Sequence, residues 1–132
     1  MRSEPDPRRL GVKGEPIVKG SETIYEIIKG EDSFGFGLAL VRIEGEPNEA
    51  HYHERTREVY VVVWGSLEVR LADINRDKIL TWRTSNKYVG AGHSLEIPRG
   101  KGHQARAPTF VRAWFYVFTF PPFSQDDYHP LI

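Results

Sequence analysis

The sequence contains no cysteine. This absence excludes disulfide bonds, thiolate nucleophiles and cysteine metal ligands together. It also fits a reducing compartment, so we expect a cytoplasmic protein. Any metal ion that the chain binds must therefore be held by nitrogen and oxygen ligands.

Long apolar runs and an excess of one charge are also missing. No segment approaches the roughly 20 apolar residues of a membrane helix, and the first residues lack the apolar core of a signal peptide. Lysine plus arginine equals aspartate plus glutamate, at 18 each, so no net field favours nucleic acid or an anionic membrane. We expect neither a membrane nor a nucleic acid as partner, and a function that lies in a local site.

The chain of 132 residues fits one compact domain, and its three Trp, six Tyr and seven Phe are enough for an aromatic core. Residues 1–16 hold three of the nine prolines and several charges. We interpret them as an extended arm that either packs on a neighbour or stays mobile. Residues 17–132 are then predicted to form a single β domain.

Short segments rich in Val, Ile, Phe, Tyr and Trp follow one another from about residue 23 and are separated by Gly, Pro, Asn and Asp. This punctuation is typical of an all-β chain, and about ten short strands favour a sandwich or a barrel. The predicted strands are 23–30, 34–45, 49–53, 58–65, 66–74, 78–84, 86–92, 94–98, 103–108 and 110–120.

The last predicted strand, 110–120, is apolar on both faces. Such a strand is covered on both sides, either by a second sheet together with the arm or by a partner subunit. We therefore predict a homodimer, while a monomer with a well-packed arm would give the same pattern.

Two histidines, His51 and His53, lie one residue apart in a chain that has five. In a strand, side chains at i and i+2 point to the same face about 6 to 7 Å apart, so both imidazoles can reach one metal ion. Glu58 lies an odd number of positions after His53. The polar residues 54–57 suit a hairpin turn, after which Glu58 returns on the neighbouring strand and faces the same interior.

A strong site needs a third nitrogen, and His103, directly after the loop at 98–102, is the natural choice. Three imidazoles and one carboxylate hold a divalent ion and leave one or two positions for water or substrate. Nitrogen and oxygen ligands do not identify the metal, so Fe, Mn, Ni, Cu and Zn all remain open.

These residues resemble the cupins. The first cupin motif is G-x5-H-x-H-x3-4-E-x6-G, and its fixed positions are filled by Gly45, His51, His53, Glu58 and Gly65.

The second motif is G-x5-P-x-G-x2-H-x3-N. Gly92, Pro98, Gly100 and His103 fill it, and Ala107 stands in place of the asparagine. The resemblance covers residues 45 to 107. It implies a small jelly-roll barrel, the double-stranded β-helix of the cupins, with a metal held inside by the three histidines and Glu58.

Further polar and aromatic residues have simpler interpretations. Tyr60 and Trp64 share the predicted inward face of Glu58, so both are weak candidates for a substrate pocket, although aromatic side chains in a small barrel are core residues first. Asp126, Asp127 and His129 would fit a second metal, but a solvated terminal segment is the simpler interpretation.

Three functions stay open. The first is a dioxygenase-like enzyme that uses a redox metal to bring a small organic substrate against oxygen. The second is a metal-dependent sugar or sugar-phosphate isomerase or epimerase, in which the metal polarises a carbonyl. The third is a small-molecule-binding protein without turnover, whose metal is structural. The sequence identifies no acid or base beyond the four ligands.

Overall fold

The structure, a computed structural model, describes residues 3–12, 14–30, 35–76, 78–83, 86–108 and 112–131. Within these ranges the regular structure is β apart from short 3-10 helices, η1 (Pro7–Arg9) and η4 (Gln125–Asp127). Among the described residues, no helix is long and apolar enough to cross a membrane.

The strands form two antiparallel sheets. The first contains, in spatial order, β1 (Ile17–Lys19), β2 (Glu22–Ile28), β3 (Gly37–Ile43), β11 (Ala113–Phe120), β5 (Arg57–Trp64) and β9 (Ser94–Ile97). The second contains β12 (His129–Pro130), β4 (His51–Tyr52), β10 (Gly102–Arg106), β6 (Ser66–Asn75) and β7 (Lys78–Trp82), with β8 (Lys87–Gly90) also paired to β6.

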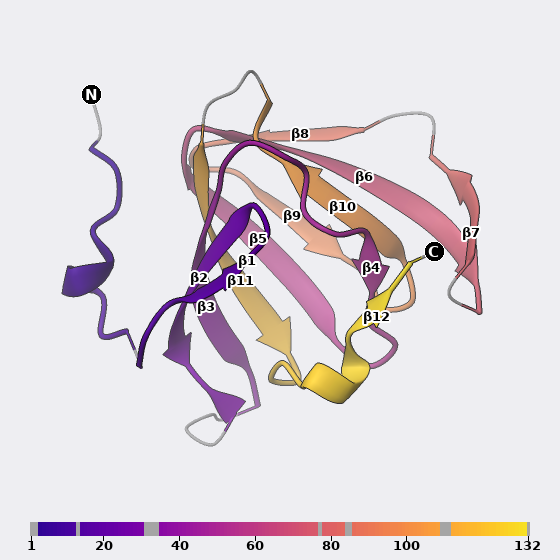
Figure 1. Cartoon of the computed structure of the whole chain (residues 1–132), viewed down its shortest axis with the longest axis horizontal. Helices are drawn as coiled ribbons and strands as arrows, with labels where there is room; N and C mark the ends of the chain where they lie inside the picture. Colours follow the sequence, from indigo (N-terminus) through magenta and orange to yellow (C-terminus); the bar gives the residue numbers. More distant parts are fainter. Residues whose placement is uncertain are drawn as a thin grey trace.

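The two sheets curl around a common interior (Figure 1). Their inward side chains form one apolar core, in which Val62, Leu67, Val69 and Phe115 are almost fully buried. This arrangement is a jelly-roll barrel and confirms the predicted all-β class. The core fills one part of the interior, and a cavity described below occupies the rest.

Strand β5 shows how the sequence pattern sets the faces. Its burial alternates from Arg57 to Val62, as expected for a strand with one face on the core. The register against β11 then shifts, because Phe115 pairs with Val62 while the preceding Trp114 pairs with Trp64. This irregularity adds one residue to β5 and places Trp64 beside Trp114, away from the core face.

The outer face of β11 is covered in part by its own chain. Glu4 accepts hydrogen bonds from Arg112 and from Trp114 Nε1, the latter at 2.8 Å, and the Trp114 ring stacks on Tyr25 at 6.0 Å. The segment before β1 therefore packs on this chain at Trp114. Residues 109–111, with the predicted strand positions Phe110 and Val111, lie outside the described residues.

Each of the ten predicted strands overlaps a strand of the structure, with differences of a few residues at the ends. Two strands were not predicted. β1 has only three residues and follows the proline-rich arm, and β12 has two residues in a segment that the sequence assigns to solvent. Both are short edge strands whose existence depends on their partners, β2 and β4, so local sequence gives little sign of them.

Gly65 joins β5 to β6 with φ of +74°, a conformation that side chains strongly disfavour. A Cβ atom there would lie 2.8 Å from the Arg112 carbonyl oxygen. Gly65→Ala is expected to lower the free energy of unfolding by about 1–3 kcal/mol. The matched control is Gly90→Ala, where a Cβ meets nothing within 4 Å and φ is not positive. Equal denaturant midpoints for the two variants would contradict this account of the turn.

Candidate metal centre

The structure brings the three predicted histidines and the glutamate together inside the barrel. One ligand atom from each of His51, His53, Glu58 and His103 lies within 4.8 Å of the others, and all four residues are buried. The residues come from both sheets: Glu58 from β5 in the first, and His51 and His103 from β4 and β10 in the second. The four side chains therefore come together only when the two sheets pack against each other to form the barrel.

Strand pairing explains how the histidines meet. His103 lies directly opposite His51 in the antiparallel pair of β10 and β4, and their ring centroids are 4.2 Å apart. His53 follows β4, and its carbonyl accepts a hydrogen bond of 2.7 Å from the N–H of Gly100. This bond ties the segment carrying His53 to the loop that leads into His103.

The same hydrogen-bonding arrangement fixes all three imidazoles. Each Nδ1 lies near a backbone carbonyl oxygen, which accepts only from a protonated nitrogen. The Nδ1–H tautomer leaves the Nε2 lone pair of each ring free to bind a metal. The distances are 2.7 Å from His51 to the Glu49 carbonyl, 2.9 Å from His53 to that of Asp127 and 3.3 Å from His103 to that of Lys101.

The atoms left free by these bonds point at one another. His53 Nε2 and His103 Nε2 lie 3.3 and 3.1 Å from Glu58 Oε1, and none of these three buried atoms has a hydrogen-bond partner of good geometry. Unpaired buried polar atoms are costly, so their convergence calls for an atom that they can share. Imidazole nitrogens and a carboxylate oxygen are suitable ligands for a divalent transition metal, so the group fits one.

Burial and mutual contact set the charges of the group. Burial, together with the electrostatic effect of the neighbouring His103, lowers the pKa of His51 to about 3, so this ring is neutral near pH 7. Burial also lowers the pKa of His53, but the adjoining Glu58 carboxylate raises it more, and the net shift is upward. The pKa of Glu58 is lowered because the two histidines outweigh its burial, so it remains ionised. In the metal-free protein a proton at His53 partly offsets the Glu58 charge.

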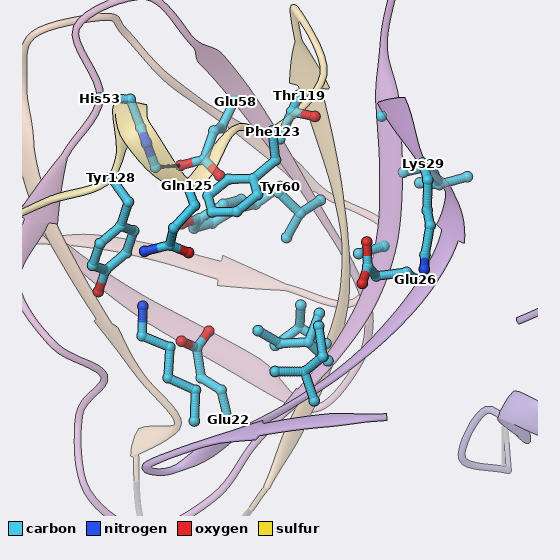
Figure 2. A pocket seen from close by; sticks show the side chains of 18 of the residues that line it. Glu22, Glu26, Lys29, His53, Glu58, Tyr60, Thr119, Phe123, Gln125 and Tyr128 are labelled. Carbon is cyan, nitrogen blue, oxygen red and sulfur yellow. Dashed lines mark ion pairs between the residues drawn. The ribbon is translucent and has the colours of Figure 1, made fainter. Parts of the chain in front are cut away.

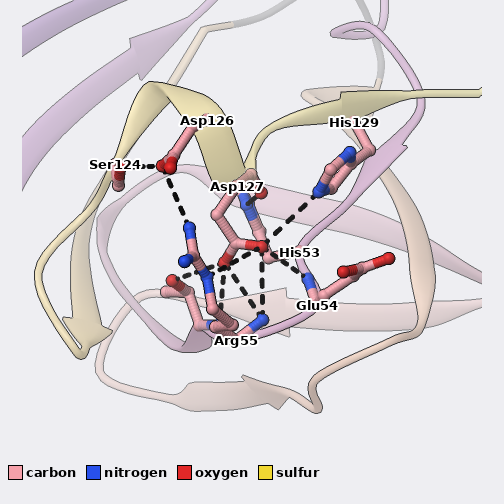
Figure 3. A network of polar contacts seen from close by, with 8 residues as sticks. His53, Glu54, Arg55, Ser124, Asp126, Asp127 and His129 are labelled. Atoms are coloured by element: carbon pink, nitrogen blue, oxygen red, sulfur yellow. Dashed lines mark hydrogen bonds and ion pairs between the residues drawn. The ribbon is translucent and has the colours of Figure 1, made fainter.

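Asp127 supports the ligands from the C-terminal segment (Figure 3). Its buried carboxylate accepts hydrogen bonds of 2.9 to 3.2 Å from the backbone N–H groups of residues 54 to 56 and one of 3.0 Å from the Thr56 hydroxyl. Its own carbonyl accepts from His53. Burial alone would raise the pKa of Asp127, but the hydrogen bonds from these donors lower it by a larger amount. The net shift is downward, so the carboxylate stays ionised. One residue thus fixes both the turn between β4 and β5 and the ring of His53.

The sequence led us to expect a solvated segment at 124–131, and the structure shows that this expectation is wrong. It passes close to β4 (Figure 1), and Tyr128 stacks on His51 with ring centroids 4.5 Å apart. The pairing of β12 with β4 and the donors that surround Asp127 account for the difference. Within the described residues, the one group of side chains that could hold a metal ion is the one at His51, and Asp126, Asp127 and His129 do not form a second such group.

A cavity of about 250 Å³ opens onto the group. His51, His53 and Glu58 line it, whereas His103 lies behind them and is fully buried. Figure 2 shows Glu58 and Glu22 entering the cavity from opposite sides. Much of the remaining wall is apolar and comes from β2, β3 and β11, including Ile24, Ile28, Val41, Phe115 and Val117.

The two weak pocket candidates have different positions. Tyr60 lines the cavity and lies 6.3 Å from the His103 ring, between centroids. Trp64 does not line it, because the irregularity in β5 places Trp64 beside Trp114, and Arg112 lies over its ring. The bulky side chain of Phe36 does not line the cavity either, and stacks on Phe118 and Phe120.

The sequence did not indicate that Glu22 and Tyr128 line the cavity, or that Asp127 supports the turn before β5 and the ring of His53. Glu22 lies on the same face of β2 as Ile24 and Glu26, but the alternate positions Thr23 and Tyr25 are equally suited to an interior, so the pattern leaves the inward face undecided. Asp127 differs from its exposed neighbour Asp126 only through tertiary contacts. The stretch Asp-Asp-Tyr-His was the only local signal for the C-terminal segment.

Metal binding is expected to displace a proton and to weaken as the pH falls. Because the pKa of His53 is raised, this ring competes for protons first, whereas His51 stays neutral in the same range. Below the His53 pKa, the apparent metal affinity should fall about tenfold for each unit of pH. Calorimetric titration in buffers of different ionisation enthalpy measures both the affinity and the proton release. A flat affinity between about pH 5 and 8 would exclude this ligand set.

Removing the Asp127 carboxylate should weaken metal binding without removing a ligand. Asp127→Ala leaves the N–H groups of residues 54 to 56 without their buried acceptor, so we expect a metal affinity roughly 10 to 100 times lower and a loss of about 3 kcal/mol in stability. Asp126→Ala is the control, since Asp126 is exposed and its ion pair with Arg55 at 3.0 Å is screened by solvent and should contribute little to stability. Wild-type metal affinity in Asp127→Ala would show that Asp127 has no part in the site.

No protein-family model matches the sequence, and no curated protein matches it. Solved structures do resemble it. The capsular polysaccharide assembling protein CapF from Staphylococcus aureus is 18% identical with a TM-score of 0.73, and the match covers 88% of this chain and 31% of CapF. An oxalate oxidase is 22% identical with a TM-score of 0.63, over 79% of this chain and 53% of the oxidase.

The cupin domain of Cnp3 from Schizosaccharomyces pombe is 10% identical with a TM-score of 0.61, over 78% of this chain and 66% of that one. This chain spans about a third of the length of CapF. At such low identity the likeness shows a shared fold. The barrel topology and these similarities confirm the resemblance found in the sequence: the chain has the cupin fold, and His51, His53, Glu58 and His103 form a candidate metal site within it.

Proposed function

We propose that the protein is a metal-dependent enzyme that acts on a small organic molecule held in the cavity beside His51. The observation that carries this proposal is the convergence of three Nε2 atoms and one carboxylate oxygen at the wall of a cavity. One of the proteins of similar fold is an oxalate oxidase, which by its name oxidises a small organic acid.

Access from the cavity favours an enzyme over a structural metal site. A structural metal is usually enclosed by its protein ligands, whereas a catalytic one keeps a position open. His51, His53 and Glu58 border the cavity, and the bulky side chains of Trp64 and Phe36, which could close it if they pointed inward, do not line it. A non-catalytic binding protein is the function that this arrangement favours least.

A dioxygenase-like oxidoreductase is the first choice of reaction. Three neutral donors and a single carboxylate suit Fe, Mn, Ni or Cu, and the apolar walls of the cavity suit an organic substrate and a reaction from which water is excluded. When bound, such a metal would supply a centre for electron transfer to oxygen. The surrounding residues would hold the substrate and exclude solvent.

A second candidate is a sugar or sugar-phosphate isomerase or epimerase. The observation in its favour is Glu22, a carboxyl group that faces the cavity without belonging to the ligand group. Isomerisation needs a proton acceptor close to the substrate and a Lewis acid such as Zn or Mn to polarise the carbonyl. The carboxyl group of Glu22 would supply the first requirement.

The two reactions are separable by one experiment. Protein reconstituted singly with Fe, Mn, Ni, Cu or Zn is incubated with small hydroxy acids, phenols and sugars in deuterated buffer, with oxygen uptake and deuterium incorporation followed together. The proposal predicts metal-dependent oxygen uptake that His51→Ala abolishes. Deuterium incorporation without oxygen uptake would establish the second candidate instead. Full turnover by metal-free protein would contradict both.

Two further expectations accompany this proposal. The predicted homodimer is supported by Ile17 and Val18, which are 45% and 73% exposed on the edge strand β1. An unpaired strand edge with exposed apolar side chains favours association with another chain. A cytoplasmic location agrees with the absence of cysteine.

A further inference from the structure

Glu22 occupies the cavity wall opposite the metal ligands. It is the first residue of β2, and its neighbours on the same face of that strand, Ile24 and Glu26, line the cavity as well. Figure 2 shows its carboxylate directed into the cavity, across from that of Glu58. Lys19 is its cross-strand partner on β1. Glu22 therefore presents a carboxyl group to whatever molecule fills the cavity.

The carboxyl group of Glu22 is held in place by a fixed neighbour. Asn48 contacts it through a side-chain hydrogen bond. Asn48 is itself buried, and its side-chain oxygen accepts a bond of 2.8 Å from the Ala105 N–H while its own N–H donates to the Ala105 carbonyl at 2.9 Å. With its oxygen engaged by β10, the amide group of Asn48 is left to donate to Glu22. This contact orients the carboxylate.

Glu22 is separate from the metal ligands. The ligand group contains His51, His53, Glu58 and His103 and does not include Glu22. Strands β2 and β5 are three steps apart in the first sheet. At about 4.8 Å for each step, Glu22 and Glu58 start from backbones up to about 14 Å apart, a distance that the curl of the sheet shortens. A small molecule fits between the two carboxylates and can contact both sides.

The two tyrosines that line the cavity and Glu58 are less suited to exchange a proton near neutral pH. Burial raises the pKa of Tyr60 well above its ordinary value, and burial together with Glu49 does the same for Tyr128, whose hydroxyl donates to Glu49 at 2.6 Å. Glu58 is committed to the histidines. Burial raises the pKa of Glu22 to about 7, with the Glu58 charge adding to the rise and Asn48 and Lys19 opposing it. A carboxyl group with such a pKa exchanges protons readily at neutral pH.

We propose that Glu22 is the catalytic acid and base of this site, which takes a proton from the bound molecule and returns it. The proposal rests on the proposed function. In the forward step an O–H or C–H bond of the substrate breaks, its electron pair stays on the substrate, and the proton forms a new O–H bond on the Glu22 carboxylate. A divalent ion at the ligand group would stabilise the negative charge that this leaves. The substrate class is accordingly a small weak acid, such as an enol, a phenol or a hydroxy-carbonyl compound.

Proton counting with acetohydroxamic acid tests this role without knowledge of the substrate. This probe is neutral at about pH 8 and binds divalent metals as an anion. At this pH Glu22 is mostly ionised in the free protein, and the anion of the bound probe should raise its pKa further, so that Glu22 keeps part of the proton and clearly less than one proton reaches the buffer from metal-loaded wild-type protein. In Glu22→Gln about one proton should be released for each probe bound. Calorimetry in two buffers measures this difference. Equal proton release in the two proteins would overturn the proposal.

The matched control is Glu26→Gln, because Glu26 lies on the same strand and lines the same cavity. It should release as few protons as the wild type. Glu22→Gln is nearly isosteric and is expected to fold. Because the pKa of Glu22 is raised in the folded state, the protein loses stability as the pH rises through about 7 and this group ionises. Above that pH, the melting temperature of Glu22→Gln should therefore equal or exceed that of the wild type. Release of about one proton by Glu26→Gln as well would assign the effect to the general field of the cavity and contradict a specific role for Glu22.

A metal-free measurement separates failure of this proposal from failure of the proposed function. Carbon-13 NMR of glutamate side chains in the metal-free protein should show one carboxyl group that titrates near pH 7 and is missing from Glu22→Gln. If the protein binds no metal but this signal is present, the proposed function fails and the proton-exchanging group stands. If metal binds and no glutamate carboxyl group titrates above its ordinary pKa of about 4.3, the proposal for Glu22 fails alone.

Discussion

The contact of each histidine Nδ1 with a backbone carbonyl is the constraint on which the metal site depends. It selects one tautomer in His51, His53 and His103, which leaves each Nε2 lone pair free, and those of His53 and His103 lie 3.3 and 3.1 Å from Glu58 Oε1. The carbonyls belong to the backbone, so the orientation is set by the path of the chain and not by further side chains. The path in turn is fixed by the pairing of β4 with β10, by the hydrogen bond from Gly100 and by the carboxylate of Asp127.

The interior of the barrel has two parts, a packed apolar core and a cavity. Aliphatic residues and Phe115 fill one part and exclude water, while the other part remains a cavity whose walls carry the histidines on one side and Glu22 on the other. Low polarity in the cavity strengthens every electrostatic effect within it. Burial favours the neutral form of an ionisable group, so it raises the pKa of Glu22 and lowers that of His51. One environment therefore favours the neutral form of both the candidate ligand His51 and the carboxyl group of Glu22.

The sequence was informative where function needs fixed spacing and uninformative where it depends on contacts between distant segments. The two motifs predict which four residues come together, because strand geometry relates His51 to His53 and a turn relates them to Glu58. The alternating pattern failed at Trp64, since an irregularity of one residue in β5 changes the face without any mark in the sequence. Asp127 was assigned to a solvated segment because its hydrogen-bond donors lie more than 70 positions away in the sequence. Glu22 was overlooked because both faces of β2 carry apolar residues.

The central claim is that a single metal ion binds to His51, His53, Glu58 and His103. Crystals of the protein loaded with Mn, Fe, Ni, Cu or Zn, with data collected on both sides of the absorption edge of that metal, test it most directly. The account predicts one anomalous peak inside the barrel, about 2.0–2.2 Å from three Nε2 atoms and from an oxygen of Glu58, with an open side toward the cavity. An anomalous map without a peak there, from crystals that contain the metal elsewhere, would contradict it.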